Sequence, residues 1–191
     1  MTNFRMHKAR HGLQAADAHL ETVHGSHLYG LAHADSDNDV YVVADLPMER
    51  AVQSTDGQDD LTIVPLDVFF FSCWRGQPKA LEALWSPQAQ MSPMMAEFAR
   101  TFRVGAGTAQ ESFRRTREHL LQPGNIEKMK SRRHALRLAI QLRSIMETGR
   151  FNPELNAHTK LLLTRIATQY PIAETFVPVM DAWYDWASDV R

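Results

Sequence analysis

The stretch Gly25-Ser26-His27-Leu28-Tyr29-Gly30-Leu31-Ala32-His33-Ala34-Asp35-Ser36-Asp37-Asn38-Asp39-Val40-Tyr41-Val42-Val43 decides the fold of the N-terminal half. It begins with a Gly-Ser pair, and ten residues separate Ser26 from Asp37. The β-branched and aromatic run Val40–Val43 predicts a strand. Residues two apart on a strand share a face, so Asp37 and Asp39 would present two carboxylates side by side where this strand begins.

The chemistry of this stretch favours a divalent cation and a phosphate group. Two adjacent carboxylates repel each other, and a hard cation with oxygen ligands, such as Mg²⁺, removes that cost. Glycine allows a close approach of backbone to phosphate, so the amides of Gly25 and Ser26 could donate to phosphate oxygens. A turn and a solvated acidic loop are the simpler alternatives. An EF-hand calcium loop is excluded, because its sixth and twelfth positions, counted from Asp35, hold Val40 and Leu46.

Outward from this stretch, strand and helix signals alternate up to about residue 88. The spacing of apolar residues within 5–23 predicts a first helix. Leu61–Val64 predicts a second strand, and 46–59, with its proline, glycine and acids, predicts a loop. The apolar run Asp67–Trp74 fits either a helix or a strand. Proline suits the first turn of a helix, so we expect a helix over 78–85.

From Pro93 onward the pattern is helical. One apolar stripe at helical spacing comprises Ala135, Leu138, Ala139, Leu142, Ile145 and Met146. Gly149 is a candidate helix stop, and Leu155–Gln169 predicts a further helix before a last one in the tail. We therefore expect an α+β fold with two domains: a core with a small mixed sheet and helices over 1–88, and a helical domain over 89–191.

The composition is that of a globular protein without a membrane span. Of 191 residues, 44% are hydrophobic and 23% are charged. The longest uncharged apolar run is far below the roughly 20 residues that a spanning helix needs. Cys73 is the single cysteine, and the N-terminus lacks the apolar stretch of a signal peptide, so we expect a cytoplasmic protein. We expect Cys73 to be a buried small side chain rather than a nucleophile.

Charge is distributed unevenly along the chain. Residues 31–67 hold nine acids and one base, whereas residues 112–143 hold nine bases and two acids. The acidic part would suit metal ions and the basic part phosphate groups. Two solvated surfaces, or an RNA-binding patch in the basic segment with steeply salt-dependent affinity, are alternatives.

These motifs carry a family resemblance. The Gly-Ser pair, the ten-residue gap and the Asp-x-Asp before a strand resemble the DNA polymerase β-like nucleotidyltransferase superfamily. More closely, they are similar to the predicted nucleotidyltransferases associated with RNA repair, a family also common in bacteriophages. Asp60–Phe69 resembles that family's acid-bearing strand running into a helix, and Gly76–Trp85 resembles its Gly-Asn-Pro-x-x-Leu-Glu-x-Leu segment. Lys130–Leu138 is a weaker match to a helix that carries Lys, His and Arg.

The resemblance implies transfer of a nucleoside monophosphate from a nucleoside triphosphate such as ATP, with release of pyrophosphate. The acceptor would be a hydroxyl of an RNA end, a protein or a small molecule. Asp37, Asp39 and Asp60 would be the catalytic carboxylates and would hold two Mg²⁺ ions, or Mn²⁺; Asp59 and Thr62 are competing positions for the third. Gly25 and Ser26 would bind the nucleotide. The alternative is an antitoxin-like module that binds Mg²⁺-nucleotide without catalysis.

A second group of nucleotide-binding residues is expected on the basic helix. At about 100° per residue, one face of this helix carries Lys130, Arg133, His134, Arg137 and Gln141 within about 60° of one line. Arginine offers bidentate contacts to phosphate. We therefore predict that Lys130, Arg133 and Arg137 contact the nucleotide. The simpler interpretation is that this face lies in solvent.

Overall fold

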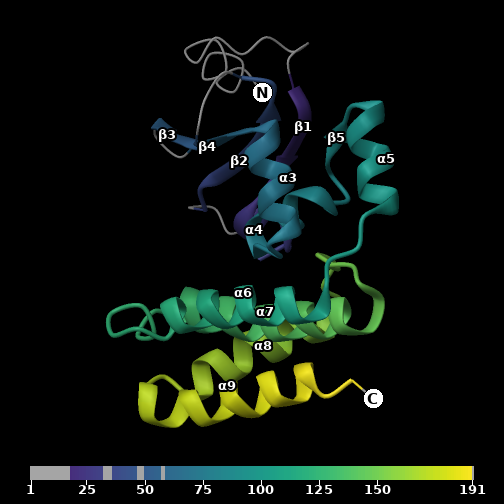
Figure 1. Ribbon diagram of the computed structural model, residues 1–191. Coiled ribbons are helices and arrows are strands. Elements are labelled where there is room, and N and C mark those ends of the chain that lie inside the picture. Colours follow the sequence, from purple (N-terminus) through teal and green to yellow (C-terminus); the bar gives the residue numbers. More distant parts are fainter. Residues whose placement is uncertain (1–17, 32–35, 47–49, 57–58, 191) are drawn as a thin grey trace. The chain divides into compact units, whose positions relative to one another are not determined.

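The computed structural model describes residues 18–31, 36–46, 50–56 and 59–190 (Figure 1). These residues form a mixed α+β structure with a five-stranded sheet, and its C-terminal half is helical, which confirms the predicted fold class. They divide into two compact units. Unit 1 takes in the described residues up to Cys73 together with Lys79–Phe102, and unit 2 comprises Trp74–Pro78 and the described residues from Arg103 onward.

The sheet of unit 1 has the strand order β3-β4-β2-β1-β5. Its central pair, β2 and β4, is parallel, whereas β1 pairs antiparallel with β2 and β5, and β3 antiparallel with β4. The strands are β1 (Ala18–Val23), β2 (Asn38–Ala44), β3 (Val52–Asp56), β4 (Asp59–Pro65) and β5 (Gln90–Met91). Strand β2 contains the predicted strand Val40–Val43, and β4 contains Leu61–Val64, so both predictions are confirmed.

The helices fall into two groups along the chain. Those that begin before Phe102 are α2 (Gly25–Leu28), α3 (Leu66–Trp74), α4 (Pro78–Leu84) and α5 (Pro93–Thr101). The helices of unit 2 are α6 (Ala106–Leu120), α7 (Met129–Thr148), α8 (Ala157–Gln169) and α9 (Ala173–Ser188). The undecided apolar run is helix α3, and α4 begins at the predicted proline. None of these helices is long and apolar enough to cross a membrane.

The two faces of the central strands differ in what they pack against. Alternate residues of β2 and β4 form one apolar cluster: Val40, Val42, Ala44, Leu61 and Ile63. On the opposite face the Tyr41 ring lies 6.1 Å from the Phe69 ring of α3. There the Thr22 hydroxyl of β1 also donates to Ser86, just after α4, at 2.6 Å. We call this second side the helix-covered face, because α3 and α4 pack on it.

Two local expectations are wrong. Residues 18–23 form strand β1 rather than the end of a helix, and the rest of the predicted helix lies outside the described residues. Leu20 and Thr22 are both buried, which is the two-residue period of a strand paired on both sides. The predicted loop contains β3, a polar strand at the edge of the sheet; with one neighbour and little burial, such a strand shows no apolar alternation.

Unit 1 extends past residue 88, where the sequence places the end of the core domain. Strand β5 pairs with β1, with Met91 opposite Leu20. The Trp85 indole donates to the Ala99 carbonyl of α5 at 3.0 Å. The Trp85 and Phe102 rings stack with centroids 5.8 Å apart. These contacts place 89–102 with the sheet.

Helix α7 is the centre of unit 2 and contacts α6, α8 and α9. The apolar stripe predicted for it is buried except for Met146, which is half-buried. Gly149 ends the helix at φ 70°, a left-handed conformation that glycine adopts without strain, so the predicted stop is confirmed. Asn156 caps α8 by accepting from the Thr159 amide at 2.8 Å.

Candidate functional site

Asp39 and Asp60 lie side by side on the two parallel strands. They are partners in the register of β2 and β4, whose backbones run about 4.8 Å apart. Directly opposed residues of a sheet share a face, and residues two apart on a strand share it too. Both side chains are therefore on the helix-covered face, two residues before the paired Tyr41 and Thr62. Both aspartates are half-buried. The sheet therefore brings together two carboxylates that are twenty-one positions apart in sequence.

Register distinguishes Asp60 from its competitors for the third carboxylate. Asp59 is the partner of Asn38, and Thr62 is the partner of Tyr41. Asp60 is therefore the acid of β4 that lies opposite Asp39. This choice needs the strand pairing, since a shift of one residue would move each side chain to the other face.

Gly25 lies against the carboxylate of Asp39. A Cβ atom on Gly25 would be 2.0 Å from Asp39 Oδ2, and the glycine has φ 62°. Both facts favour glycine at this position, because a larger residue would be strained at this φ and would shift the Asp39 carboxylate. The His24 amide also donates to the Asp39 carbonyl at 2.7 Å. Gly25 and Ser26, the first residues of α2, are thus held directly beside the start of β2; we call this pair the glycine turn.

One oxygen of Asp60 lacks a hydrogen bond. Its Oδ1 atom is buried and no described group donates to it. A buried carboxylate oxygen left in this state costs free energy, and a bound cation or a water normally satisfies it. Together with the all-oxygen donor set, this oxygen makes the pair a chemically suitable Mg²⁺ ligand set.

The remaining predicted carboxylate, Asp37, does not form a metal-binding group with this pair among the described residues. Asp37 directly precedes β2 and is exposed. In the part of the chain that the structure describes, no group of three or more His, Cys, Asp or Glu side chains is placed so that it could hold a metal ion. Mg²⁺ commonly takes one or two protein carboxylates and completes its shell with water and substrate phosphates. The Asp39–Asp60 pair meets that smaller requirement.

A buried polar cluster around His24 packs against Tyr41, two residues after Asp39 on β2. The His24 ring stacks on Tyr41 with centroids 5.4 Å apart. Its Nδ1 lies 3.4 Å from Glu82 Oε2, and its Nε2 lies 3.1 Å from the Lys79 carbonyl oxygen. Both ring nitrogens therefore face acceptors, an arrangement that an imidazolium satisfies fully. Burial is the main cause that raises the pKa of Tyr41 well above its usual range, so its phenol stays neutral.

Lys79 is a residue of this region that sequence reasoning did not select. It is exposed on α4, and its ammonium donates to Thr62 Oγ1 at 3.2 Å. The same ammonium lies 5.8 Å from the centroid of the Tyr41 ring. A proline-lysine pair at a helix start carries no signal by itself; only the packing of α4 on the sheet places this lysine.

The residues predicted on the basic helix lie in unit 2, on α7. Lys130 is exposed, Arg133 is half-buried, and Arg137 and Gln141 are buried. The simpler interpretation of a solvent face is therefore wrong for Arg137 and Gln141. Arg133 Nε and both polar atoms of the Gln141 amide are buried and have no hydrogen-bond partner among the described residues. Contact of Lys130, Arg133 and Arg137 with a nucleotide stays a prediction.

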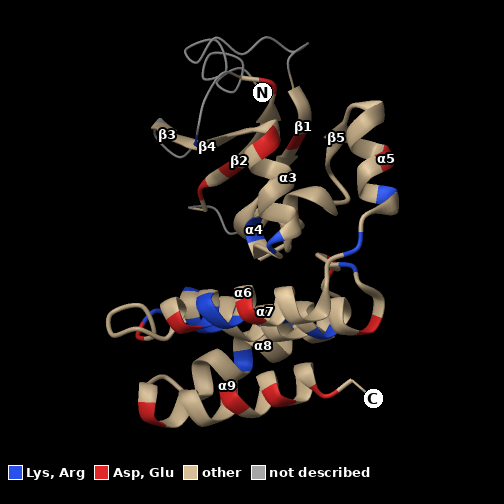
Figure 2. Cartoon of the chain, in the orientation of Figure 1, with Lys and Arg blue, Asp and Glu red and all other residues tan. Residues whose placement is uncertain are grey.

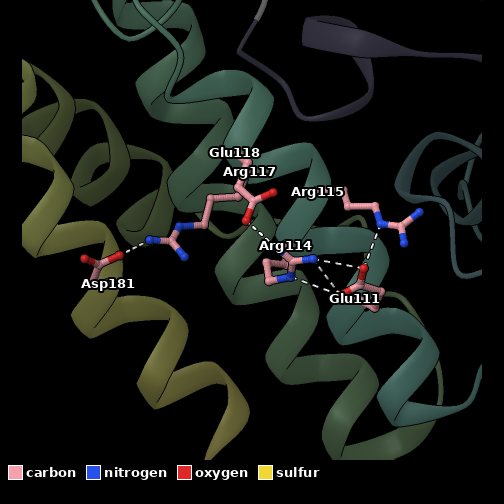
Figure 3. Close-up of polar contacts among 6 residues, drawn as sticks. All are labelled: Glu111, Arg114, Arg115, Arg117, Glu118 and Asp181. Carbon is pink, nitrogen blue, oxygen red and sulfur yellow. Dashed lines mark hydrogen bonds and ion pairs between the residues drawn. The ribbon is translucent and has the colours of Figure 1, made fainter.

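Much of the remaining basic segment is paired with acids. Figure 2 shows basic and acidic positions interleaved along α6. In Figure 3 Glu111 accepts from Arg114 and Arg115, Glu118 accepts from Arg114, and Asp181 of α9 accepts from Arg117. Glu111 and Asp181 fall outside the 112–143 window over which the sequence charge is counted. This pairing weakens the interpretation of that segment as an RNA-binding patch.

The sequence was also compared with known proteins. No protein-family model and no curated protein matches this chain.

Proposed function

We propose that the protein is a metal-dependent nucleotidyltransferase that uses the Asp39–Asp60 pair. The observation that carries the proposal is the register that sets these carboxylates side by side, next to Gly25, whose positive φ and close contact with Asp39 favour glycine. Asp39 and Asp60 would hold Mg²⁺ or Mn²⁺ together with the remaining predicted carboxylate, Asp37. When bound, the ions would polarise the phosphoryl oxygens and lower the pKa of the attacking hydroxyl.

In the proposed reaction an acceptor hydroxyl oxygen attacks the α-phosphorus of a nucleoside triphosphate. The bond from this phosphorus to the bridging oxygen of the β-phosphate breaks, and pyrophosphate leaves while the hydroxyl proton passes to solvent. The residues of the chain would hold the ions and orient the phosphates. The Gly25 and Ser26 backbone would lie along the phosphates, and the two aspartates would fix the ion positions on rigid strands.

The test is transfer of label from α-³²P nucleoside triphosphates in Mg²⁺ to RNA 3′ ends, protein side chains and small alcohols. Asp39→Asn and Asp60→Asn should each lower transfer by about 100-fold or more, because ion stabilisation of the transition state amounts to several kcal/mol. Asp45→Asn is the matched control, since Asp45 is exposed directly after β2. Transfer that persists unchanged in both variants would refute the mechanism.

The second candidate is a module that binds Mg²⁺-nucleotide without turnover. It is favoured by the absence, among the described residues, of a preassembled group of three metal ligands. Titration calorimetry with Mg²⁺-ATP separates the two candidates. Binding that depends on Asp39 and Asp60, with no transfer to any acceptor, favours the module; transfer that depends on the same residues favours the enzyme.

A further inference from the structure

The helix-covered face carries a positive charge next to the two carboxylates. Thr62 lies two residues beyond Asp60 on β4, and Tyr41 lies two residues beyond Asp39 on β2. The Lys79 ammonium rests on this second row, bonded to the Thr62 hydroxyl and over the Tyr41 ring. Successive residues on one face of a strand are about 6.6 Å apart, so the cation lies one step from the carboxylate row.

We infer that Lys79 binds the phosphate chain of a nucleotide whose metal ion sits on Asp39 and Asp60; this inference rests on the proposed function. A polyphosphate on a metal ion at the carboxylate row still carries uncompensated negative charge. A lysine is a common partner for such charge, because its ammonium is a compact point charge with rotatable donors.

The hydrogen bonds of Lys79 leave it available for a ligand. An ammonium has three N–H donors, and the Thr62 hydroxyl takes one of them. Among the described residues Lys79 forms no direct ion pair with a carboxylate. The contact with Tyr41 is weak at an exposed site. Two donors are therefore free to meet phosphate oxygens.

The backbone of Lys79 is fixed to the glycine turn. Its carbonyl oxygen accepts from the buried ring of His24, which directly precedes Gly25. Glu82, one turn further along α4, lies against the other nitrogen of the same ring. The lysine and the turn that would carry the phosphates are thus joined through one histidine, which sets the position of the cation relative to the turn.

Titration calorimetry of the full chain with Mg²⁺-ATP and Mg²⁺-AMP tests the inference. Lys79→Gln should weaken ATP binding about tenfold or more and AMP binding by less than about threefold, because AMP lacks the outer phosphates. Lys79→Arg should retain most of the ATP affinity. Lys160→Gln, on α8, is the matched control for loss of one positive charge, and it should leave both affinities unchanged.

A second measurement uses the wild-type protein and so does not depend on the folding of a variant. Acylation of lysine amines, read by mass spectrometry, should slow at Lys79 when Mg²⁺-ATP is present and should not slow with Mg²⁺-AMP. Wild-type ATP binding without this protection, or with an unaffected Lys79→Gln variant, overturns the inference and leaves the proposed function in place. Failure of the wild type to bind ATP overturns both.

Discussion

Asp60 of β4 stands directly opposite Asp39 of the parallel neighbour β2, and its buried Oδ1 receives no hydrogen bond from the described chain. Two carboxylates placed side by side repel each other, and a cation bound between them would remove that cost. Ligand binding at this point of the sheet should therefore appear directly in the stability of the fold.

We expect Mg²⁺-ATP at about 100 times its dissociation constant to raise the melting temperature by about 5–10 °C, because a ligand that binds only the native state stabilises it. Asp60→Asn should abolish this increase. In EDTA the same variant should melt at or above the wild-type temperature, since it removes one of two like charges. Differential scanning calorimetry measures both conditions. An increase that survives in Asp60→Asn would place the ligand elsewhere.

Gly25→Ala should cost both stability and ligand affinity. The left-handed φ of 62° disfavours alanine by about 1–2 kcal/mol, and the new Cβ would in addition displace the Asp39 carboxylate. Urea unfolding and ATP titration measure the two effects. Gly124→Ala is the matched control, because Gly124 has φ 80° with nothing within 4 Å of an added Cβ. The control should lose stability alone; an equal effect of the two substitutions on ATP affinity would contradict this prediction.

Arg132 should be among the most important single residues for the stability of unit 2. It is buried, and its guanidinium donates to four backbone carbonyls, those of Ile126, Glu127, Ala167 and Pro171, at 2.7–3.1 Å. Arg132→Met should lower the free energy of unfolding by about 3–5 kcal/mol, because several buried acceptors lose their donor at once.

Surface arginines of the same unit should behave differently. Arg115 is largely exposed in its pair with Glu111. Arg115→Met should change the free energy of unfolding by less than about 1 kcal/mol, as for most exposed ion pairs. Denaturant unfolding monitored by circular dichroism compares the two variants; equal losses would show that the carbonyl contacts of Arg132 contribute little.

Stability should fall at alkaline pH. Burial raises the pKa of Tyr184 well above its ordinary value of 10.0, although the nearby Arg117 charge opposes the shift. Below pH 10 the phenol is protonated in both states, so its contribution is fully present. Above pH 10 only the unfolded state releases the proton, and the free energy of unfolding decreases by up to about 1.4 kcal/mol per pH unit.

Tyr184→Phe should reduce that slope between pH 10 and pH 11, because it removes the ionisable hydroxyl. Urea titrations across this range measure the slope. Tyr41 and Cys73 are also buried with raised pKa values, so the substitution should remove only part of the dependence.

The sequence predicts those parts of the fold that carry a local pattern. Val40–Val43 and Leu61–Val64 alternate or cluster apolar residues as buried strands do, and Gly149 ends α7 where the helical stripe ends. The sequence does not predict strand β1, because Leu20 and Val23 also fit the spacing of a helix. Strand β3 was missed because polar residues at a sheet edge give no burial signal.

The candidate site could be predicted only in part for the same reason. One short stretch suggests Asp37, Asp39 and Gly25, and the family resemblance suggests Asp60. Only the strand register, however, shows that Asp60 rather than Asp59 or Thr62 lies opposite Asp39. The position of Lys79 can be predicted only when the packing of α4 on the sheet is known. Contacts between elements that are distant in the chain cannot be predicted from the residue spacing or the composition of the sequence.

The close fit of Gly25 against Asp39 means that the Asp39 side chain becomes ordered when the chain folds. The side chain of this aspartate is confined by its neighbour as soon as the chain folds, so its rotamer entropy, about 0.5 kcal/mol for a short side chain, is lost at that step. If a cation binds as proposed, it would meet a carboxylate whose orientation is already fixed, and it would not have to immobilise that side chain. In the proposed site Gly25, which has no side chain to contact the ligand, would therefore contribute to the affinity through Asp39.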